Sequence, residues 1–171
     1  DYADAYYNIG VAFQDQGKLE EALEAFNKAL SINSDDAEIY NNMGIVLAEM
    51  DKLEEAIEVY KKALLQKPDY AEAYNNMGVA LKEQGKLDEA IEIFYKTLSL
   101  KPDYFEAYYN MGNAIKKQGR PEEAIKAYKK ALSIKPDYAE AYNNMGNVMK
   151  DQGKLEKAIE AYKKAILIKP D

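Results

Sequence analysis

The chain has 171 residues, 31% of them charged, and a formal net charge of −7 at neutral pH. It contains no cysteine and no histidine, which excludes disulfides, thiolate nucleophiles, imidazole bases and the usual zinc ligands. The negative charge argues against general nucleic-acid binding, because that binding depends on lysine and arginine neutralising phosphates. No apolar run approaches the roughly 18 residues of a membrane span, and no signal peptide opens the chain. We therefore expect a soluble protein without cofactor, metal, nucleic-acid or membrane partners, cytoplasmic by default.

A period of 34 residues runs through the whole sequence and is marked by one glycine in every unit: Gly10, Gly44, Gly78, Gly112 and Gly146. With this glycine counted as position 8, position 4 is always tyrosine, position 20 is always alanine and position 24 is always aromatic. Proline stands at position 32 in four units, and Ser34 replaces it in the first. The period predicts one array of five repeats at 3–36, 37–70, 71–104, 105–138 and 139–171.

In chain order, the sequence begins and ends inside a period. Asp1 and Tyr2 occupy positions 33 and 34 of an earlier unit, and Asp171 stops at position 33 of the last. We therefore expect residues 1–171 to be excised from a longer array.

Within each repeat the apolar spacing predicts two helices. In residues 71–104, one apolar stripe runs from Ala71 to Leu81 and a second from Leu87 to Leu98, each at helical spacing. The turn between them holds Gly85, and glycine adopts the left-handed geometry that ends a helix. The equivalent turn residues, in chain order, are Gly17, Asp51, Gly85, Gly119 and Gly153. Pro121 lies where the second helix of the fourth repeat would start, a position that suits its fixed φ.

This pattern resembles the tetratricopeptide repeat (TPR) family, which combines an aromatic, Leu-Gly, two small alanines, an aromatic and a closing proline in 34 residues. Isoleucine or methionine occupies the position of the family's leucine in all five units. The resemblance implies an all-α fold, a right-handed superhelical α-solenoid of five helix-turn-helix units. It also implies a protein or peptide ligand in a concave groove lined by the first helices.

On a helical wheel, positions 2, 5, 6, 9, 12 and 13 of the first helix form an arc that packing within the repeat leaves free. Position 6 is asparagine in all five repeats: Asn8, Asn42, Asn76, Asn110 and Asn144. An amide offers both a donor and an acceptor, so it can hold the backbone of an extended peptide. This file of side chains resembles the asparagine ladder of O-GlcNAc transferases. The alternative is that the asparagines bond to neighbouring groups or merely descend from a duplicated unit, and the sequence leaves both interpretations open.

Other positions on the arc supply further candidate ligand-binding residues. They are Asn41, Asn75, Asn143, Tyr7 and Tyr109 at position 5, Asn113 and Asn147 at position 9, and Lys82, Lys116 and Lys150 at position 12. Lysines on an exposed helix face usually contact only water. Position 2 is acidic throughout, which would favour a basic ligand, but the spacing of Asp69 and Glu72 favours a capping box instead.

Two classes of function fit this surface. The first is a protein-interaction scaffold that binds an extended or helical peptide, and the second is the substrate-binding arm of a larger enzyme such as a glycosyltransferase. The two-carboxylate clamp of the family is disfavoured, because no lysine stands at position 5 and acid stands at position 2. We expect no catalysis by the chain itself, since no nucleophile has a base beside it. The acidic first repeat and mildly basic last repeats predict weak head-to-tail self-association.

Overall fold

The computed structural model describes residues 2–170, so Asp1 and Asp171, on which the expectation about the chain ends partly rests, lie outside the described residues. These residues contain no strand and form ten α-helices: α1 (Tyr2–Asp15), α2 (Leu19–Ile32), α3 (Ala37–Glu49), α4 (Leu53–Gln66), α5 (Ala71–Glu83), α6 (Leu87–Leu100), α7 (Phe105–Lys117), α8 (Pro121–Ile134), α9 (Ala139–Asp151) and α10 (Leu155–Ile168). The fold is an all-α solenoid of helix-turn-helix repeats, and Pro121 begins α8 as its sequence position predicts.

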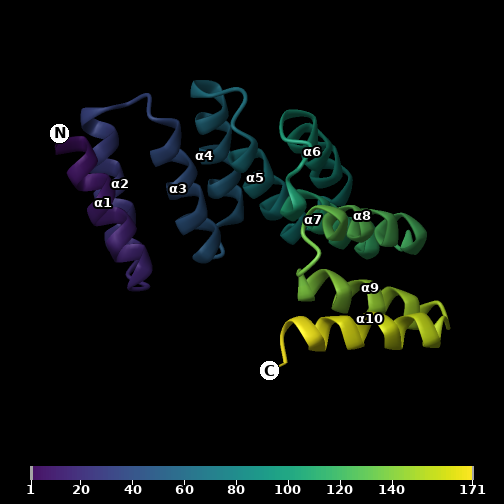
Figure 1. The fold of residues 1–171 in the computed structure, drawn as a ribbon. Coiled ribbons are helices and arrows are strands. Elements are labelled where there is room, and N and C mark those ends of the chain that lie inside the picture. Colours follow the sequence, from purple (N-terminus) through teal and green to yellow (C-terminus); the bar gives the residue numbers. More distant parts are fainter. Residues whose placement is uncertain (1, 171) are drawn as a thin grey trace. The chain divides into compact units, whose positions relative to one another are not determined.

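The chain divides into two compact units, Asp1–Gly85 with α1 to α5 and Lys86–Asp171 with α6 to α10. The division falls in the turn of the third repeat. In the first unit, α1 packs on α2 and α3 on α4, while α2 contacts α3 and α4 contacts α5 across the repeat boundaries (Figure 1). The first helices also contact one another directly, α1 with α3 and α3 with α5.

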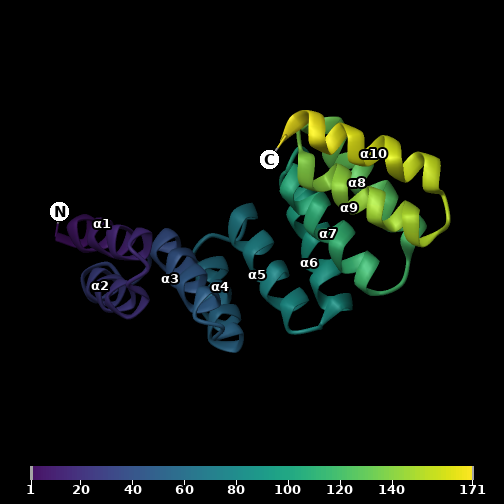
Figure 2. The same cartoon turned by 90° about the horizontal axis from the view of Figure 1, so that it is seen from below.

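The second unit is built on the same plan. Helix α7 packs on α8 and α9 on α10, and both views show these pairs side by side (Figures 1 and 2). Helix α6 contacts α7, α8 contacts α9, and the first helices α7 and α9 also touch. The contact between first helices of successive repeats positions the candidate site.

A close approach of the two helices explains the glycine at position 8. A Cβ built on Gly10 would lie 2.6 Å from Cε1 of Phe26, and one on Gly112 would lie 2.7 Å from Cε1 of Tyr128. No real Cβ tolerates such a contact with a packed ring, so the aromatic residue at position 24 requires glycine opposite it. The same pairing joins Gly44 to Tyr60 and Gly146 to Tyr162.

The turns inside the repeats have the left-handed geometry that the sequence predicts. Gly17, Gly85, Gly119 and Gly153 have φ between 71° and 79°, and Asp51 takes the same conformation at φ 61°. A Cβ would meet nothing within 4 Å at any of these four glycines. The preference for glycine at these turns is therefore a backbone effect, and Asp51 carries the corresponding strain.

The capping-box prediction is wrong. Helix α5 begins at Ala71 with Tyr70 as its N-cap, so Asp69 lies one residue too early, and no side chain caps this end. Helices α7 and α9 likewise begin after a tyrosine without a side-chain cap. Only α3 differs among these four repeats, because Asp36 replaces the tyrosine and its Oδ1 accepts from the backbone N–H groups of Glu38 and Ile39 at 2.9 and 3.2 Å.

Candidate functional site

Three of the five asparagines at position 6 hydrogen-bond to the residue at position 5 of the preceding repeat. Asn42 Nδ2 donates to the hydroxyl of Tyr7 at 2.8 Å, and Asn76 Nδ2 donates to Oδ1 of Asn41 at 3.0 Å. In the second unit, Asn144 Nδ2 donates to the hydroxyl of Tyr109 at 3.0 Å. These bonds join first helices of successive repeats. Of the other two, Asn8 is exposed, and Asn110 also has an interaction partner.

Tyr7 links α1 to two residues of α3. Its hydroxyl donates to Oε1 of Glu38 at 2.7 Å while accepting from Asn42. Burial, followed by the hydrogen bond and charge of Glu38, raises the pKa of Tyr7 to about 12. The tyrosine is therefore protonated at neutral pH and keeps the proton that it donates to the carboxylate.

The asparagines at position 9 accept hydrogen bonds from the tyrosine at position 24 of their own repeat. Tyr128 donates to Oδ1 of Asn113, and Tyr162 donates to Oδ1 of Asn147, both at 2.8 Å. Asn113 Oδ1 also accepts from Asn144 Nδ2 at 2.9 Å. Tyr109, Asn113, Tyr128 and Asn144 thus form one polar network across α7, α8 and α9, and the bond of Tyr162 to Asn147 is separate from it. Burial raises the pKa of the Tyr128 hydroxyl, which thus remains a donor.

Position 5 is less accessible than the helical wheel predicts. Asn41 and Asn75 are buried, with 5% and 6% of their surface exposed, whereas Tyr7 and Tyr109 are half-buried and Asn143 is exposed. The prediction that Asn41 and Asn75 lie on a free arc is therefore wrong. The wheel represents one isolated helix, but within the first unit α5 packs across Asn41 of α3, as the bond from Asn76 to Asn41 shows.

The lysines at position 12 do not form one exposed file either. Lys82 is largely buried and its Nζ lies 2.9 Å from Oε1 of Glu83, while Lys116 is half-buried and Lys150 is exposed.

The net charges of the two units differ in sign. Residues 1–85 hold 7 basic and 17 acidic side chains, net −10, whereas residues 86–171 hold 16 and 13, net +3.

The sequence reasoning missed the tyrosines at position 24 as members of the site. A usable signal was present: asparagine at position 9 accompanies tyrosine at position 24 in the last two repeats, while valine accompanies phenylalanine in the first and third. It also missed glutamines that bridge repeats. Gln118 Nε2 donates to Asp88 at 2.7 Å, and Gln152 Nε2 donates to Glu122 at 2.6 Å.

The geometry provides amide acceptors rather than reactive groups. Between residues 2 and 170, the Oδ1 atoms of Asn76 and Asn144 receive no hydrogen bond from the protein, although the Nδ2 atoms are engaged. In the same range, acidic side chains do not cluster in a way that would hold a metal ion. None of the helices described is long and apolar enough to cross a membrane.

Models of the tetratricopeptide repeat match residues 3–36, 139–171, 35–103 and 81–127, and a TPR repeat model matches residues 112–153. Together these matches span nearly the whole chain. The chain belongs to the tetratricopeptide repeat family. No curated protein sequence matches it.

Several solved structures share the fold. The crystal structure of MamA is 28% identical with a TM-score of 0.82, covering 99% of this chain and 92% of MamA. YrrB, a TPR protein with an unusual peptide-binding site, is 26% identical with a TM-score of 0.73, covering 97% of this chain and 86% of YrrB. PilF of Pseudomonas aeruginosa is 23% identical with a TM-score of 0.89, covering 97% and 76%, and it shows the fold alone. MamA and YrrB support a protein-interaction scaffold with protein or peptide partners.

Proposed function

We propose that the first helices within each unit bind an extended peptide along their partly exposed side. The observation that carries this proposal is the orientation of the position-6 amides. The preceding repeat holds the Nδ2 groups of Asn76 and Asn144, which leaves the carbonyl oxygens as acceptors with no donor from the described residues. A bound peptide would supply the missing donors from its backbone N–H groups.

This arrangement favours an extended over a helical ligand. In a helix the interior N–H groups are already bonded to the helix's own carbonyls, whereas an extended chain presents free N–H groups along its length. The asparagine side chains are held in place before binding, so less conformational entropy is lost when the ligand arrives. Each backbone bond would contribute about 0.5 to 1.5 kcal/mol without selecting the peptide's side chains.

The experiment is backbone N-methylation of a peptide selected from a random display library for binding to the chain. Methylation removes one N–H donor at a time and retains the side chain. We expect a loss of about tenfold in affinity at alternate positions, since that ratio corresponds to about 1.4 kcal/mol. A peptide whose affinity survives methylation at every position would refute the proposal.

The proposal assigns binding and no chemistry to the chain. Most of its carboxylates are exposed, and two of them pair with cations at i,i+3: Glu58 with Lys61 and Glu123 with Arg120, both at 2.6 Å. Such exposed ion pairs are hydrated and contribute little to the stability of the fold.

We also propose that copies of the chain associate weakly, the first repeat of one against the last repeat of another. Ile159 and Ile166 of α10 are 52% and 62% exposed, whereas their equivalents Ile57 and Leu132 are only 6% and 8% exposed because a neighbouring repeat covers them. At the other end, Ile9 is 44% exposed and its equivalent Met43 is 9% exposed. Each terminal repeat thus presents apolar side chains whose equivalents in inner repeats are covered.

A further inference from the structure

A second surface of the first unit, away from the asparagines, has the features of a docking groove. It lies between α2, α3 and α4 and has a volume of about 440 Å³. Met43 and Leu47 form its buried floor, and the half-buried Leu23 and Val59 line its sides. We name it the α2–α4 groove. Its volume lies within the roughly 300 to 1,000 Å³ that is typical of ligand sites.

One rim of the α2–α4 groove is acidic. Glu54, Glu55 and Glu58 line it from α4, and all three are exposed. Lysine and arginine are absent from the residues that line it. Glu58 pairs with Lys61 at 2.6 Å, but both side chains are more than half exposed, so the pair is weak and can exchange for a cation of a ligand.

The equivalent groove of the second unit shows that the size and the acidic rim of the α2–α4 groove do not follow from the repeat pattern alone. It lies between α6, α7 and α8 and has a volume of about 200 Å³, less than half as large. Tyr95 occupies the repeat position of Asn27 and lines this smaller groove, while Asn27 lines the larger one. Its rim carries Lys126 and Lys130 beside Glu123. The two grooves therefore differ in size and in the sign of their rims.

We propose that the α2–α4 groove binds a cationic amphipathic helix of a partner protein. The apolar residues of that helix, spaced at i, i+3 and i+4, enter the groove over Met43 and Leu47. Its lysine or arginine residues pair with Glu54, Glu55 and Glu58 at the rim. The net charge of −10 on residues 1–85 accelerates the approach of such a ligand. None of the position-5 or position-6 residues lines this groove, so it is separate from the proposed peptide site.

The first test titrates the protein with a synthetic amphipathic helix of leucine and lysine while amide and methyl NMR signals are recorded. We expect shift changes at Leu23, Met43 and Val59 and none at Asn42 or Asn76. Two control peptides separate the contribution of the cationic side chains from that of the apolar face. They are a leucine–glutamate helix of the same pattern and a scrambled leucine–lysine peptide without an apolar face. Both should bind at least tenfold more weakly. Equal binding of the scrambled peptide would show that net charge alone attracts the ligand, and would overturn the proposal.

The second test uses variants that change the groove and leave the core intact. Asn27→Tyr introduces the residue that stands in the smaller groove and should weaken binding of the leucine–lysine helix at least tenfold. Glu54→Gln, Glu55→Gln and Glu58→Gln together should weaken it and flatten its salt dependence. The matched control is Tyr95→Asn, which enlarges the cationic groove and should leave the affinity unchanged. Native affinity in the Asn27→Tyr protein and in the triple glutamine variant would refute the proposal, and circular dichroism checks that each variant folds.

Discussion

At the residue scale, the asparagine amides at position 6 present different groups to the protein and to solvent. The N–H groups of Asn42, Asn76 and Asn144 bond to the preceding repeat, so half of each amide is structural. Within residues 2–170, the carbonyl oxygens of Asn76 and Asn144 accept no hydrogen bond from the protein, and we propose that they accept from a peptide. The sequence left two interpretations open, that the asparagines hold a peptide backbone or that they bond to neighbouring groups. The two are compatible, because each concerns a different atom of the same side chain.

The pairing of tyrosine at position 24 with asparagine at position 9 can be tested within this one chain. Tyr128→Phe removes the hydroxyl that donates to Asn113 and should lower the free energy of unfolding by about 0.5 to 1.5 kcal/mol. Tyr60→Phe is the matched control, because Ile45 occupies position 9 of that repeat and offers no acceptor. This variant should be nearly neutral in urea unfolding. Equal losses in the two variants would show that the hydrogen bond is not the cause.

Asp51 is the second residue whose effect can be isolated. It holds φ at 61° where four other turns have glycine, and the left-handed conformation costs a residue with a Cβ about 1 to 2 kcal/mol. We expect Asp51→Gly to stabilise the protein by up to about 1 kcal/mol, partly offset by the greater freedom of glycine in the unfolded chain. Gly153→Ala is the reverse control and should destabilise by a similar amount, since no atom lies near a Cβ there. Thermal unfolding of both variants measures the difference, and a lower melting temperature for Asp51→Gly would contradict this account.

At the element scale, the sequence predicts the helices and their turns because both depend on local patterns. The apolar stripes of residues 71–104 correspond to α5 and α6, and the left-handed turn at Gly85 is confirmed. The surface of the first helices was harder to predict. Burial of Asn41 depends on the next repeat, and the N-cap depends on whether position 34 is tyrosine or aspartate, as Tyr70 and Asp36 show. A helical wheel contains neither kind of information.

The crossing of α7 and α8 at Gly112 gives a prediction about packing between elements. Gly112→Ala gains about 1 kcal/mol of helix propensity, but its Cβ would lie 2.7 Å from Cε1 of Tyr128. We expect a net loss of about 1 to 3 kcal/mol in the free energy of unfolding. Adding Tyr128→Leu removes the ring, so the double variant should be more stable than the sum of the two single effects. Strict additivity of the two changes in urea unfolding would contradict the clash.

At the scale of the whole molecule, stability is expected to vary with the number of neighbouring repeats. A repeat with one neighbour buries less apolar surface than a repeat with two, as the exposures of Ile9 and Ile159 show against Met43 and Ile57. In a quasi-one-dimensional array these terms add along the chain. We therefore expect amide hydrogens of α1 and α10 to exchange faster than those of α3 and α4 in the first unit and of α7 and α8 in the second. Uniform protection along the chain would contradict this expectation.

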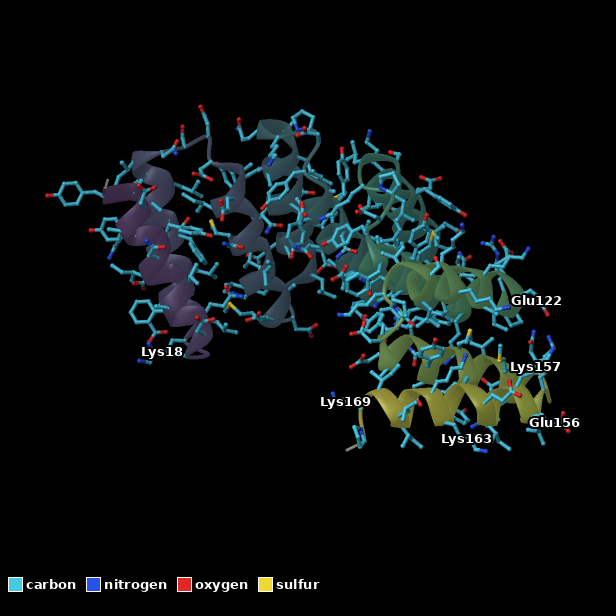
Figure 3. All side chains as sticks on the ribbon, viewed as in Figure 1. Lys18, Glu122, Glu156, Lys157, Lys163 and Lys169 are labelled. Carbon is cyan, nitrogen blue, oxygen red and sulfur yellow. The ribbon has the colours of Figure 1, made fainter. Side chains whose placement is uncertain are left out.

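The association of copies through their terminal repeats is also a property of the whole molecule. The acidic first repeat, residues 3–36, has 2 basic and 7 acidic side chains, net −5, whereas the last repeat, residues 139–171, has 6 and 5, net +1. In the last repeat, Lys157, Lys163 and Lys169 lie around α10 together with the acidic Glu156 at the start of this helix (Figure 3). In the proposed contact, the apolar face of α10 therefore contributes most, and the small positive charge of the last repeat adds a weak attraction to the acidic first repeat of another copy.

Sedimentation at high protein concentration measures this association directly. We expect weak, open-ended oligomers at low salt that dissociate as salt is added, because a head-to-tail contact does not close unless its rotation permits. Ile166→Ser should abolish them, since it removes apolar surface from the exposed face of α10. Leu65→Ser is the matched control: Leu65 of α4 is 77% exposed and lies outside both terminal repeats, so the same loss of apolar surface should have no effect. A strict monomer at every salt concentration, or equal effects of the two substitutions, would rule out end-to-end contact through α10.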